Sequence, residues 1–363
     1  MPVGSLFTGR YWVRQGKIKT SVSMTSSSEA SLTSATTCGS STGTAATASA
    51  HRSDSANCWP WMKDTKCRLD HPISHVDPND KRPPVQALIL KHSSDIAQLK
   101  QSLQTHPLYN PHKHDDLWIM RFLLSHRMNH AAALEAAQNT LVFRHEYNLD
   151  EWDIRHILVT AKDLHESDYP YAHATAKMFD CYDTEDTMIY YVPDPKRGVV
   201  GFLHLAGRNQ HRMAETLSEQ DYFEAHLFST EWKFQWLDYL TRSTGLMTKY
   251  LSIVDCTGCH RGMMNKHSKH MDSQAAKTME DKYPQLLGSM LIVNAPIWIN
   301  VIFAIIKPFV PKRLLERINL IKPSKKERDL HQLQEYISLS DLPERYGGFL
   351  NEWPPPLPSC HFM

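Results

Sequence analysis

Between residues 187 and 294, short runs of β-branched and aromatic residues alternate with longer helical patterns. The runs with the composition of strands are TMIYYV at 187–192, GVVGFLHL at 198–205, YLSIVD at 250–255 and SMLIVN at 289–294. PDPKR separates the first two runs and predicts a strand–turn–strand unit, whereas helical patterns separate the later runs. This alternation predicts an α/β sheet with crossover helices.

The helix predicted after residue 218 carries clear local signals. Ser218 and Asp221 have the spacing of a capping box, and Gly245 is a natural end for the helix. A large apolar residue recurs at every fourth position along it, namely at Phe228, Trp232, Trp236 and Leu240. Such a stripe is typical of core packing. Another helix is expected at 262–282.

Residues 85–158 have a helical pattern throughout. Trp118 and Phe122 share one face of a helix within 115–128, and Asn129 is a suitable N-cap for the helix that follows. The apolar stripe predicted for that second helix consists of Leu134, Ala137, Leu141 and Val142. The sequence therefore predicts a helical region before the α/β part.

The first 84 residues differ in composition from the rest. Residues 1–56 are rich in Ser, Thr and Ala and poor in acidic residues, which fits either a disordered tail or an organelle transit peptide. Residues 57–84 contain five prolines and predict an irregular linker. Seven scattered cysteines indicate a reducing compartment, and a net charge of +1 argues against nucleic acid as the main partner.

The segment CTGCH at 256–260 matches the C-x-x-C-H pattern of covalent haem attachment. A haem would also need an exposed site and a second axial ligand, and nothing else in the sequence requires one. Zinc is the alternative, because four possible ligands follow C-x2-C-x7-H-x2-H, although both intervals are shorter than in the usual finger. These four are Cys256, Cys259, His267 and His270.

The run 288–306 is long and apolar, but Asn294, Pro296 and Asn300 interrupt it. A spanning helix needs about 20 apolar residues, so we expect no membrane span here. Within the run, 297–306 suits a strand by propensity or a helix that begins at Pro296, and it is either a closed core element or in contact with lipid. Eight basic residues at 307–328 form either a solvated face or a surface attracted to anionic membranes.

Three blocks occur in a distinctive order, at 115–152, 283–318 and 341–350. The middle block contains YPQLLG, NAP and KPF, and DLPERYGGFL forms the last. Together they resemble the CRAL-TRIO lipid-transfer family, with Gln285 in place of the usual Glu. The resemblance implies a small N-terminal helical lobe followed by an α/β lipid-binding domain, whose sheet floors a lipid pocket below a mobile gate helix. It also places CTGC in a turn after the strand that ends at Asp255.

The resemblance implies a lobe at 85–158, a lipid-binding domain at 159–352 and a C-terminal tail at 353–363, after the extension and linker at 1–84. The expected function is binding one phospholipid, such as phosphatidylinositol or phosphatidylcholine, and exchanging it at membranes. The alternative is a lipid-gated scaffold or sensor without net transfer. We expect no enzyme, because Walker, G-x-S-x-G and H-E-x-x-H motifs are missing, and no cofactor beyond bound lipid.

The resemblance also implies which residues meet the lipid. The expected gate residues are Ile297, Trp298, Val301, Ile302, Phe303 and Ile306. The positions corresponding to phosphatidylinositol contacts are His126, Arg127, Gln274, Arg313 and Arg317, and the hydroxyls suited to phosphatidylcholine belong to Tyr250 and Ser252. We expect a cytoplasmic monomer in peripheral contact with anionic membranes, or organelle import if the N-terminal segment is a transit peptide.

Overall fold

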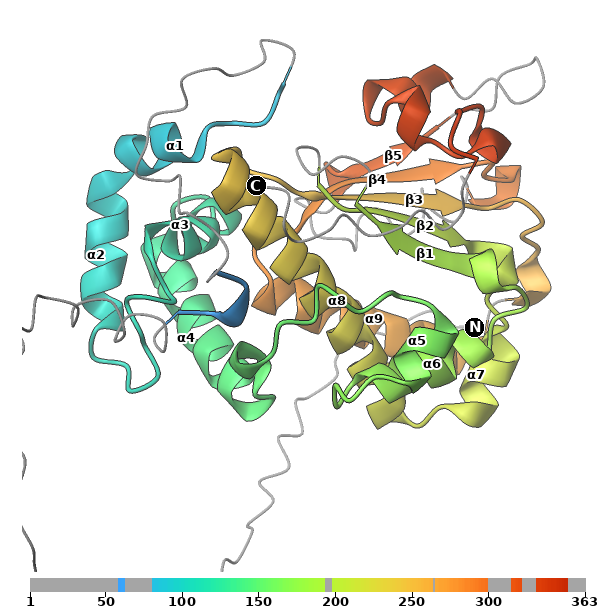
Figure 1. Cartoon of the computed structure of the whole chain (residues 1–363), viewed down its shortest axis with the longest axis horizontal. Helices are drawn as coiled ribbons and strands as arrows, with labels where there is room; N and C mark the ends of the chain where they lie inside the picture. The colour runs from blue at the N-terminus through green and yellow to red at the C-terminus, as the bar shows by residue number, and fades with distance from the viewer. Residues whose placement is uncertain are drawn as a thin grey trace, which may run out of the picture. The chain divides into compact units, whose positions relative to one another are not determined.

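The computed structural model of the chain describes residues 58–62, 80–192, 198–263, 265–299, 315–321 and 331–351 (Figure 1). Its helices are α1 (Val85–Lys91), α2 (Ser93–Leu103), α3 (Asp116–Ser125), α4 (His130–Glu146), α5 (Ala161–His165), α6 (Ala172–Asp180), α7 (Gln210–Thr216), α8 (Glu219–Thr244) and α9 (Lys266–Lys282). Its strands are β1 (Met188–Tyr191), β2 (Val200–His204), β3 (Tyr250–Asp255), β4 (Leu287–Val293) and β5 (Ile318–Leu320). The predictions for 1–57, 300–314 and 353–363 lie outside these residues.

The strands of the described residues form one sheet in the order β1-β2-β3-β4-β5. β1 and β2 pair antiparallel, and the other neighbours pair in parallel. Parallel neighbours need a crossover connection, which α7 and α8 supply between β2 and β3 and α9 supplies between β3 and β4. The predicted α/β sheet, the pairing of its first two strands and its crossover helices are therefore confirmed, whereas the turn PDPKR lies outside the described residues.

One face of the sheet is largely covered, and we call it the covered face. A register line across β1 to β4 on this face consists of Ile189, Phe202, Ile253 and Leu291. Each of these four side chains is at most 5% exposed. The C-terminal segment 331–350, in red in Figure 1, packs on them through Leu333, Ile337, Leu342 and Tyr346. The covered face is an ordinary part of the core.

The opposite face of the sheet is also apolar, yet most of its side chains are only partly buried. Because side chains alternate along a strand, this face carries an aliphatic row made of Leu203, Val254, Met290, Ile292, Ile318 and Leu320. None of the six is fully buried or fully exposed. We call this surface the partly exposed face. An apolar face that protein does not fully cover is suited to an apolar ligand.

Helix α8 is largely buried along its 26 residues. Ser218 and Asp221 form the predicted capping box, and Gly245 ends the helix with a φ of 69°. The predicted stripe is confirmed as core, because each member is at most 1% exposed: Phe228, Trp232, Trp236 and Leu240. The helix also buries polar side chains on its other faces, since it packs between the sheet and the helical lobe.

Ion pairs connect α8 to the helical lobe. Arg121 Nη1 of α3 lies 2.7 Å from Asp238 Oδ1, and Arg144 of α4 donates to both carboxylate oxygens of Glu231 at 3.1 Å. Trp61 Nε1 donates to Asp238 Oδ2 at 3.1 Å, and the Trp61 side chain has no exposed surface. This tryptophan lies in the region that composition predicts to be irregular, and its aromatic ring anchors residues 58–62 in the core.

The helical lobe follows its predicted pattern with one exception. Asn129 caps α4 by accepting a hydrogen bond from the Ala132 amide, and the rings of Trp118 and Phe122 lie 4.5 Å apart. The inclusion of Val142 in the apolar stripe was wrong, because this side chain is 40% exposed. Each helical residue turns by roughly 100°, so the residue after buried Leu141 leaves the core face.

Candidate functional site

A polar group of side chains lies on the partly exposed face where it adjoins α8. Tyr190 on β1, Gly201 on β2 and Ser252 on β3 follow one register line, and Tyr250 lies two residues before Ser252. A Cβ atom at Gly201 would lie 2.2 Å from Tyr250 Oη and 2.8 Å from Tyr190 Cδ1. The glycine therefore provides the space in which both aromatic rings lie over β2.

Lys233 of α8 extends into the same group. Its Nζ atom lies 4.7 Å from the centre of the Tyr190 ring and 4.9 Å from the centre of the Tyr250 ring. Lys233 is 8% exposed, and it makes no hydrogen bond or ion pair with any described residue. Contacts with aromatic faces replace only part of the hydration that an ammonium group loses on burial. We call Lys233, Tyr190, Tyr250, Ser252 and Ser229 the Lys233 group.

Burial changes the acid–base properties of the Lys233 group. Removal from water lowers the pKa of Lys233 to about 7. The same effect raises the pKa of Tyr190 to about 12 and raises the pKa of Tyr250 well above its ordinary value. Both phenols therefore stay protonated near neutral pH, whereas the lysine changes its charge in that range.

A basic group lies where the helical lobe meets the sheet. Lys249 Nζ donates to Gln285 Oε1 at 2.7 Å, and Gln285 Nε2 donates to Ser125 Oγ at 3.0 Å. Burial, together with the positive charges of Arg317 and Arg121, lowers the pKa of Lys249 to about 8. Positive charges that lower the pKa of a neighbouring amine in this way also favour the binding of an anion at the same place.

Three residues predicted to contact the headgroup lie near this basic group. His126 is the C-cap of α3, and Arg127 follows it with a φ of 51°. Arg127 Nη2 lies 3.7 Å from Glu316 Oε2, and the neighbouring residue Arg317 contributes its charge at Lys249. The structure thus brings the end of α3 next to the start of β5, although the two are far apart in sequence.

The other predicted headgroup residues have separate positions. Tyr250 and Ser252 both belong to the Lys233 group on β3. Gln274, on α9, makes a hydrogen bond of 2.8 Å between its Nε2 and His270 Nε2, one helical turn earlier. Arg313 lies outside the described residues.

The run 288–306 is divided as the sequence predicts. Strand β4 ends at Val293, and Ile297, Trp298 and Ile299 are helical, with the Ile299 amide donating to the Pro296 carbonyl at 2.9 Å. Of the two alternatives for 297–306, the helix is therefore the one observed at its start. In the described part of the chain, no helix has the length and apolar character needed to cross a membrane.

The start of the expected gate is exposed. Ile297 is 84% exposed, which is a large exposure for an aliphatic side chain, whereas Trp298 is partly buried. The remaining expected gate residues lie outside the described residues, namely Val301, Ile302, Phe303 and Ile306.

The CTGC segment forms a turn at the end of β3. The Asp255 carboxylate accepts hydrogen bonds from the Thr257 amide at 2.9 Å and from Asn294 Nδ2 at 3.0 Å. Gly258 has a φ of 75°, a conformation that glycine adopts readily. Asp255 therefore ties this turn to the Asn-Ala-Pro segment that follows β4.

Cys256 and Cys259 are free thiols in this turn. A hydrogen bond between the two sulfur atoms lowers the pKa of Cys259, and the same bond together with burial raises the pKa of Cys256. Across the described residues, no three His, Cys, Asp or Glu side chains gather in a way that could hold a metal ion. The proposed zinc set, which added His267 and His270 to the two cysteines, is therefore not brought together.

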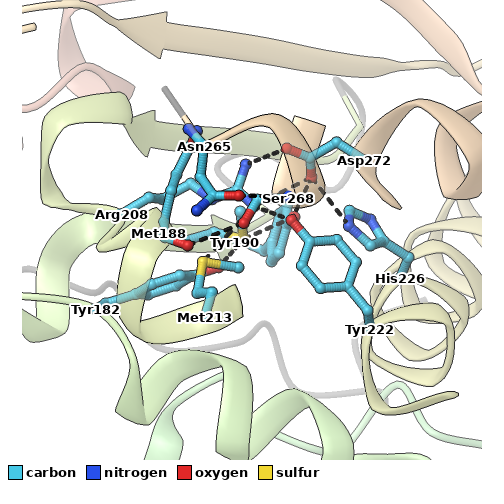
Figure 2. Close-up of polar contacts among 11 residues, drawn as sticks. Tyr182, Met188, Tyr190, Arg208, Met213, Tyr222, His226, Asn265, Ser268 and Asp272 are labelled. Atoms are coloured by element: carbon cyan, nitrogen blue, oxygen red, sulfur yellow. Dashed lines mark hydrogen bonds and ion pairs between the residues drawn. The ribbon is translucent and has the colours of Figure 1, made fainter. Parts of the chain in front are cut away.

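Figure 2 shows a further polar cluster, which joins α8 and α9 to the loop after β2. Arg208 donates to both carboxylate oxygens of Asp272, at 3.1 and 3.3 Å. The Tyr222 hydroxyl accepts from Arg208 at 2.9 Å and donates to Asp272 at 2.8 Å, and His226 Nε2 lies 3.5 Å from the same carboxylate. The guanidinium holds the pKa of Asp272 well below its usual range. Because both charges are paired, we interpret this cluster as a structural clamp.

A small cavity lies in the helical lobe, with a volume of about 200 Å³. Its lining is mostly polar and includes Asn110, Lys113, Arg144 and Asp150. Sites for small molecules typically have volumes of about 300–1,000 Å³, so this cavity is too small for a two-chain lipid.

Sequence reasoning missed several residues of the two polar groups, among them Tyr190, Lys233 and Lys249. Lys233 follows Trp232 inside the apolar stripe of α8, and a lone lysine in a buried helix was the available signal. Tyr190 and Lys249 carried no local signal, because their importance depends on which strands lie side by side.

Comparison with protein families matches residues 185–348 to the CRAL/TRIO domain. The chain is 24% identical over 243 residues to a CRAL-TRIO domain-containing protein of Saccharomyces cerevisiae, an alignment that covers 64% of this chain and 71% of the yeast protein. It is 22% identical over 239 residues to a phosphatidylinositol/phosphatidylcholine transfer protein of Arabidopsis thaliana, covering 66% of this chain and 40% of the plant protein. The crystal structure of Sfh5 aligns with a TM-score of 0.40 and 13% identity, over 66% of this chain and 81% of that one.

Proposed function

The chain contains a CRAL/TRIO domain, and from this premise we propose that it binds a single phospholipid and exchanges it at membrane surfaces. The observation that carries the proposal is the aliphatic row of the partly exposed face, which protein covers incompletely. The acyl chains would lie along this row, from β2 toward β5. The Lys233 group lies at one end of it.

The physical chemistry of lipids requires that exchange take place at a membrane. A phospholipid with two long chains has about 30 methylenes, which at about 0.8 kcal/mol each amount to roughly 25 kcal/mol for transfer into water. A lipid cannot leave its binding site into water at a useful rate against such a cost. At a bilayer surface the tails are solvated equally well on both sides, so headgroup contacts decide which lipid is carried.

We propose phosphatidylinositol or phosphatidylcholine as the lipid, because one relative is named a transfer protein for these two. The inositol headgroup would meet three basic residues, Lys249, Arg127 and Arg317. Further proposed contacts are His126, Gln274 and Arg313. The phosphatidylcholine headgroup would meet the hydroxyls of Tyr250 and Ser252. The basic group supports the first choice, since like charges gather there.

We propose that the helix beginning at Ile297 is the gate and that it contacts an anionic, cytoplasm-facing membrane. The 84% exposure of Ile297 supports this role, because a membrane would remove an exposed aliphatic side chain from water. Basic residues at 307–328 would add roughly 1 kcal/mol per charge near an anionic surface. We also propose that the chain consists of a lobe at 85–158 and a lipid-binding domain at 159–352. Its proposed role is that of a lipid carrier and not of an enzyme.

The test is to purify the full-length protein from a lipid-replete host and to identify co-purifying lipid by mass spectrometry. We expect about one phospholipid per chain, and transfer of that phospholipid between donor and acceptor vesicles. Lipid capture without transfer would favour the lipid-gated scaffold or sensor. A protein that holds no lipid and extracts none from mixed vesicles would contradict both functions.

A further inference from the structure

Lys233 is a buried amine that has no counter-charge among the described residues. Other cations around the same helix are paired: Arg121 and Arg242 contact Asp238, and Arg144 contacts Glu231. Lys233 differs from them because it points toward the sheet, where the rings of Tyr190 and Tyr250 face it. An ammonium group in such surroundings gains strongly from an anion that comes from outside the protein.

The two aromatic rings that face this amine belong to tyrosines, and each carries a hydroxyl group. Tyr190 Oη on β1 donates to Met188 Sδ at 3.1 Å, and Ser229 Oγ, one turn before Lys233 on α8, donates to the His226 carbonyl at 3.2 Å. Tyr250 and Ser252 are two residues apart on β3 and therefore lie on the same face of the sheet. Hydroxyls can rotate to donate to a ligand oxygen, so the amine and its neighbours together offer several donors to one anionic group.

We propose that the Lys233 group binds the acidic group of the carried lipid, either a phosphodiester or a carboxylate. This inference rests on the proposed function, since it assumes a lipid on the partly exposed face. It adds two points to that function: the carried lipid must have a negatively charged group, and it must bind in one orientation. For phosphatidylcholine, whose headgroup the proposed function places at Tyr250 and Ser252, the acidic end lies deep against α8, and the acyl chains extend over the aliphatic row toward β4 and β5.

Chemistry favours an anionic oxygen over a neutral headgroup at this place. A sterol or diacylglycerol hydroxyl could accept a hydrogen bond from Lys233, but it would leave the ammonium charge without compensation. A phosphodiester or carboxylate supplies the charge and accepts from the hydroxyls as well. Charge-assisted hydrogen bonds contribute about 1.5–3 kcal/mol, which corresponds to a roughly 10- to 100-fold difference in affinity.

The test compares three pyrene-labelled lipids bound by the delipidated full-length protein: phosphatidylcholine, a long-chain fatty acid, and a diacylglycerol with the same chains as the phosphatidylcholine. We expect wild type to bind at least one acid-bearing lipid roughly 10- to 100-fold more tightly than the diacylglycerol. Lys233→Met should lose this preference and bind the diacylglycerol as wild type does. The phosphatidylcholine and fatty-acid arms decide between phosphodiester and carboxylate.

The exposed residue Lys177, paired with Asp221 on the surface, provides a matched control for loss of one positive charge. Lys177→Met should bind all three lipids like wild type. Equal binding of acid-bearing lipids by wild type and Lys233→Met, or a wild-type preference for diacylglycerol, would overturn the inference and leave the carrier function standing. A wild type that binds none of the three lipids would overturn both.

A second measurement needs no variant, and it remains informative if Lys233→Met fails to fold. An anion beside Lys233 favours its protonated form, so acid-lipid binding at pH 8 should take up about one proton, seen by calorimetry in buffers of different ionisation heat. The titratable groups that face Lys233 are Tyr190 and Tyr250, and both phenols remain protonated at pH 8. Binding of an acidic lipid without proton uptake would count against the proposed contact.

Discussion

At the scale of single residues, Lys233 combines burial with an ionisable amine. In the ligand-free protein its pKa of about 7 lies below the ordinary value of 10.5. Between these values the unfolded chain holds a proton that the folded chain lacks, so this group makes the protein more stable as pH rises from 7 toward 10. Below pH 7 the folded protein must bury the charge, and the contribution is lost.

We predict that this pH dependence disappears in Lys233→Met. The free energy of unfolding of wild type, relative to the variant, should rise by about 1.4 kcal/mol per pH unit within that window. Urea unfolding of the delipidated proteins at pH 7, 8 and 9 measures this difference. Parallel pH curves for the two proteins would mean that Lys233 titrates normally and is not buried as described.

At the scale of elements, the helix that begins at Ile297 has an exposed start in a chain whose other helices bury apolar faces. We predict that Ile297→Asp slows vesicle-to-vesicle lipid transfer by roughly 10-fold or more, because an aspartate cannot enter the apolar part of a membrane surface. Stability should change by less than about 0.5 kcal/mol, since the side chain is 84% exposed. Pyrene-lipid transfer assays and thermal unfolding measure the two effects.

Leu90 is a matched control for this prediction. It is 65% exposed and lies on α1, in the helical lobe and far along the sequence from the expected gate. Leu90→Asp should transfer lipid at the wild-type rate. A similar loss of transfer in both variants would point to general surface hydrophobicity instead of a gate.

At the scale of the whole molecule, the buried contacts of α8 join the helical lobe to the sheet. Asp238 is central, because it pairs with Arg121 at 2.7 Å and with Arg242 at 2.8 Å and accepts from Trp61. These partners keep the pKa of Asp238 at about 2 despite its burial, so the carboxylate is charged throughout the neutral range.

We predict that Asp238→Ala lowers the free energy of unfolding by about 3–5 kcal/mol, because buried Arg121 loses its counter-charge and Arg242 keeps only Asp115. Urea unfolding followed by tryptophan fluorescence measures the loss. Asp221→Ala, which removes the surface partner of Lys177, should cost less than about 2 kcal/mol, including its helix cap. Similar losses of stability in the two variants would contradict a central role for the ion pairs of Asp238.

Local interactions explain why much of the fold was predictable from the sequence. The capping box at Ser218, the N-cap at Asn129 and the end of α8 at Gly245 each depend on residues only a few positions apart. The strands follow from short β-branched runs, and the turn at Asp255 follows from the carboxylate and Gly258 beside it. Such features form wherever the local sequence occurs, so a pattern of neighbours is enough to find them.

The site depended on contacts that only the tertiary structure decided. Tyr190 and Tyr250 face Lys233 because the sheet register and the packing of α8 bring together three segments. Trp61 contacts Asp238 across 177 positions of sequence, inside a region with the composition of a linker. Burial and charge compensation are properties of the surrounding atoms and not of neighbouring residues. The sequence by itself therefore determined strands β1 to β4, several helices and the family resemblance, whereas the fold determined that buried Lys233 has no counter-charge among the described residues.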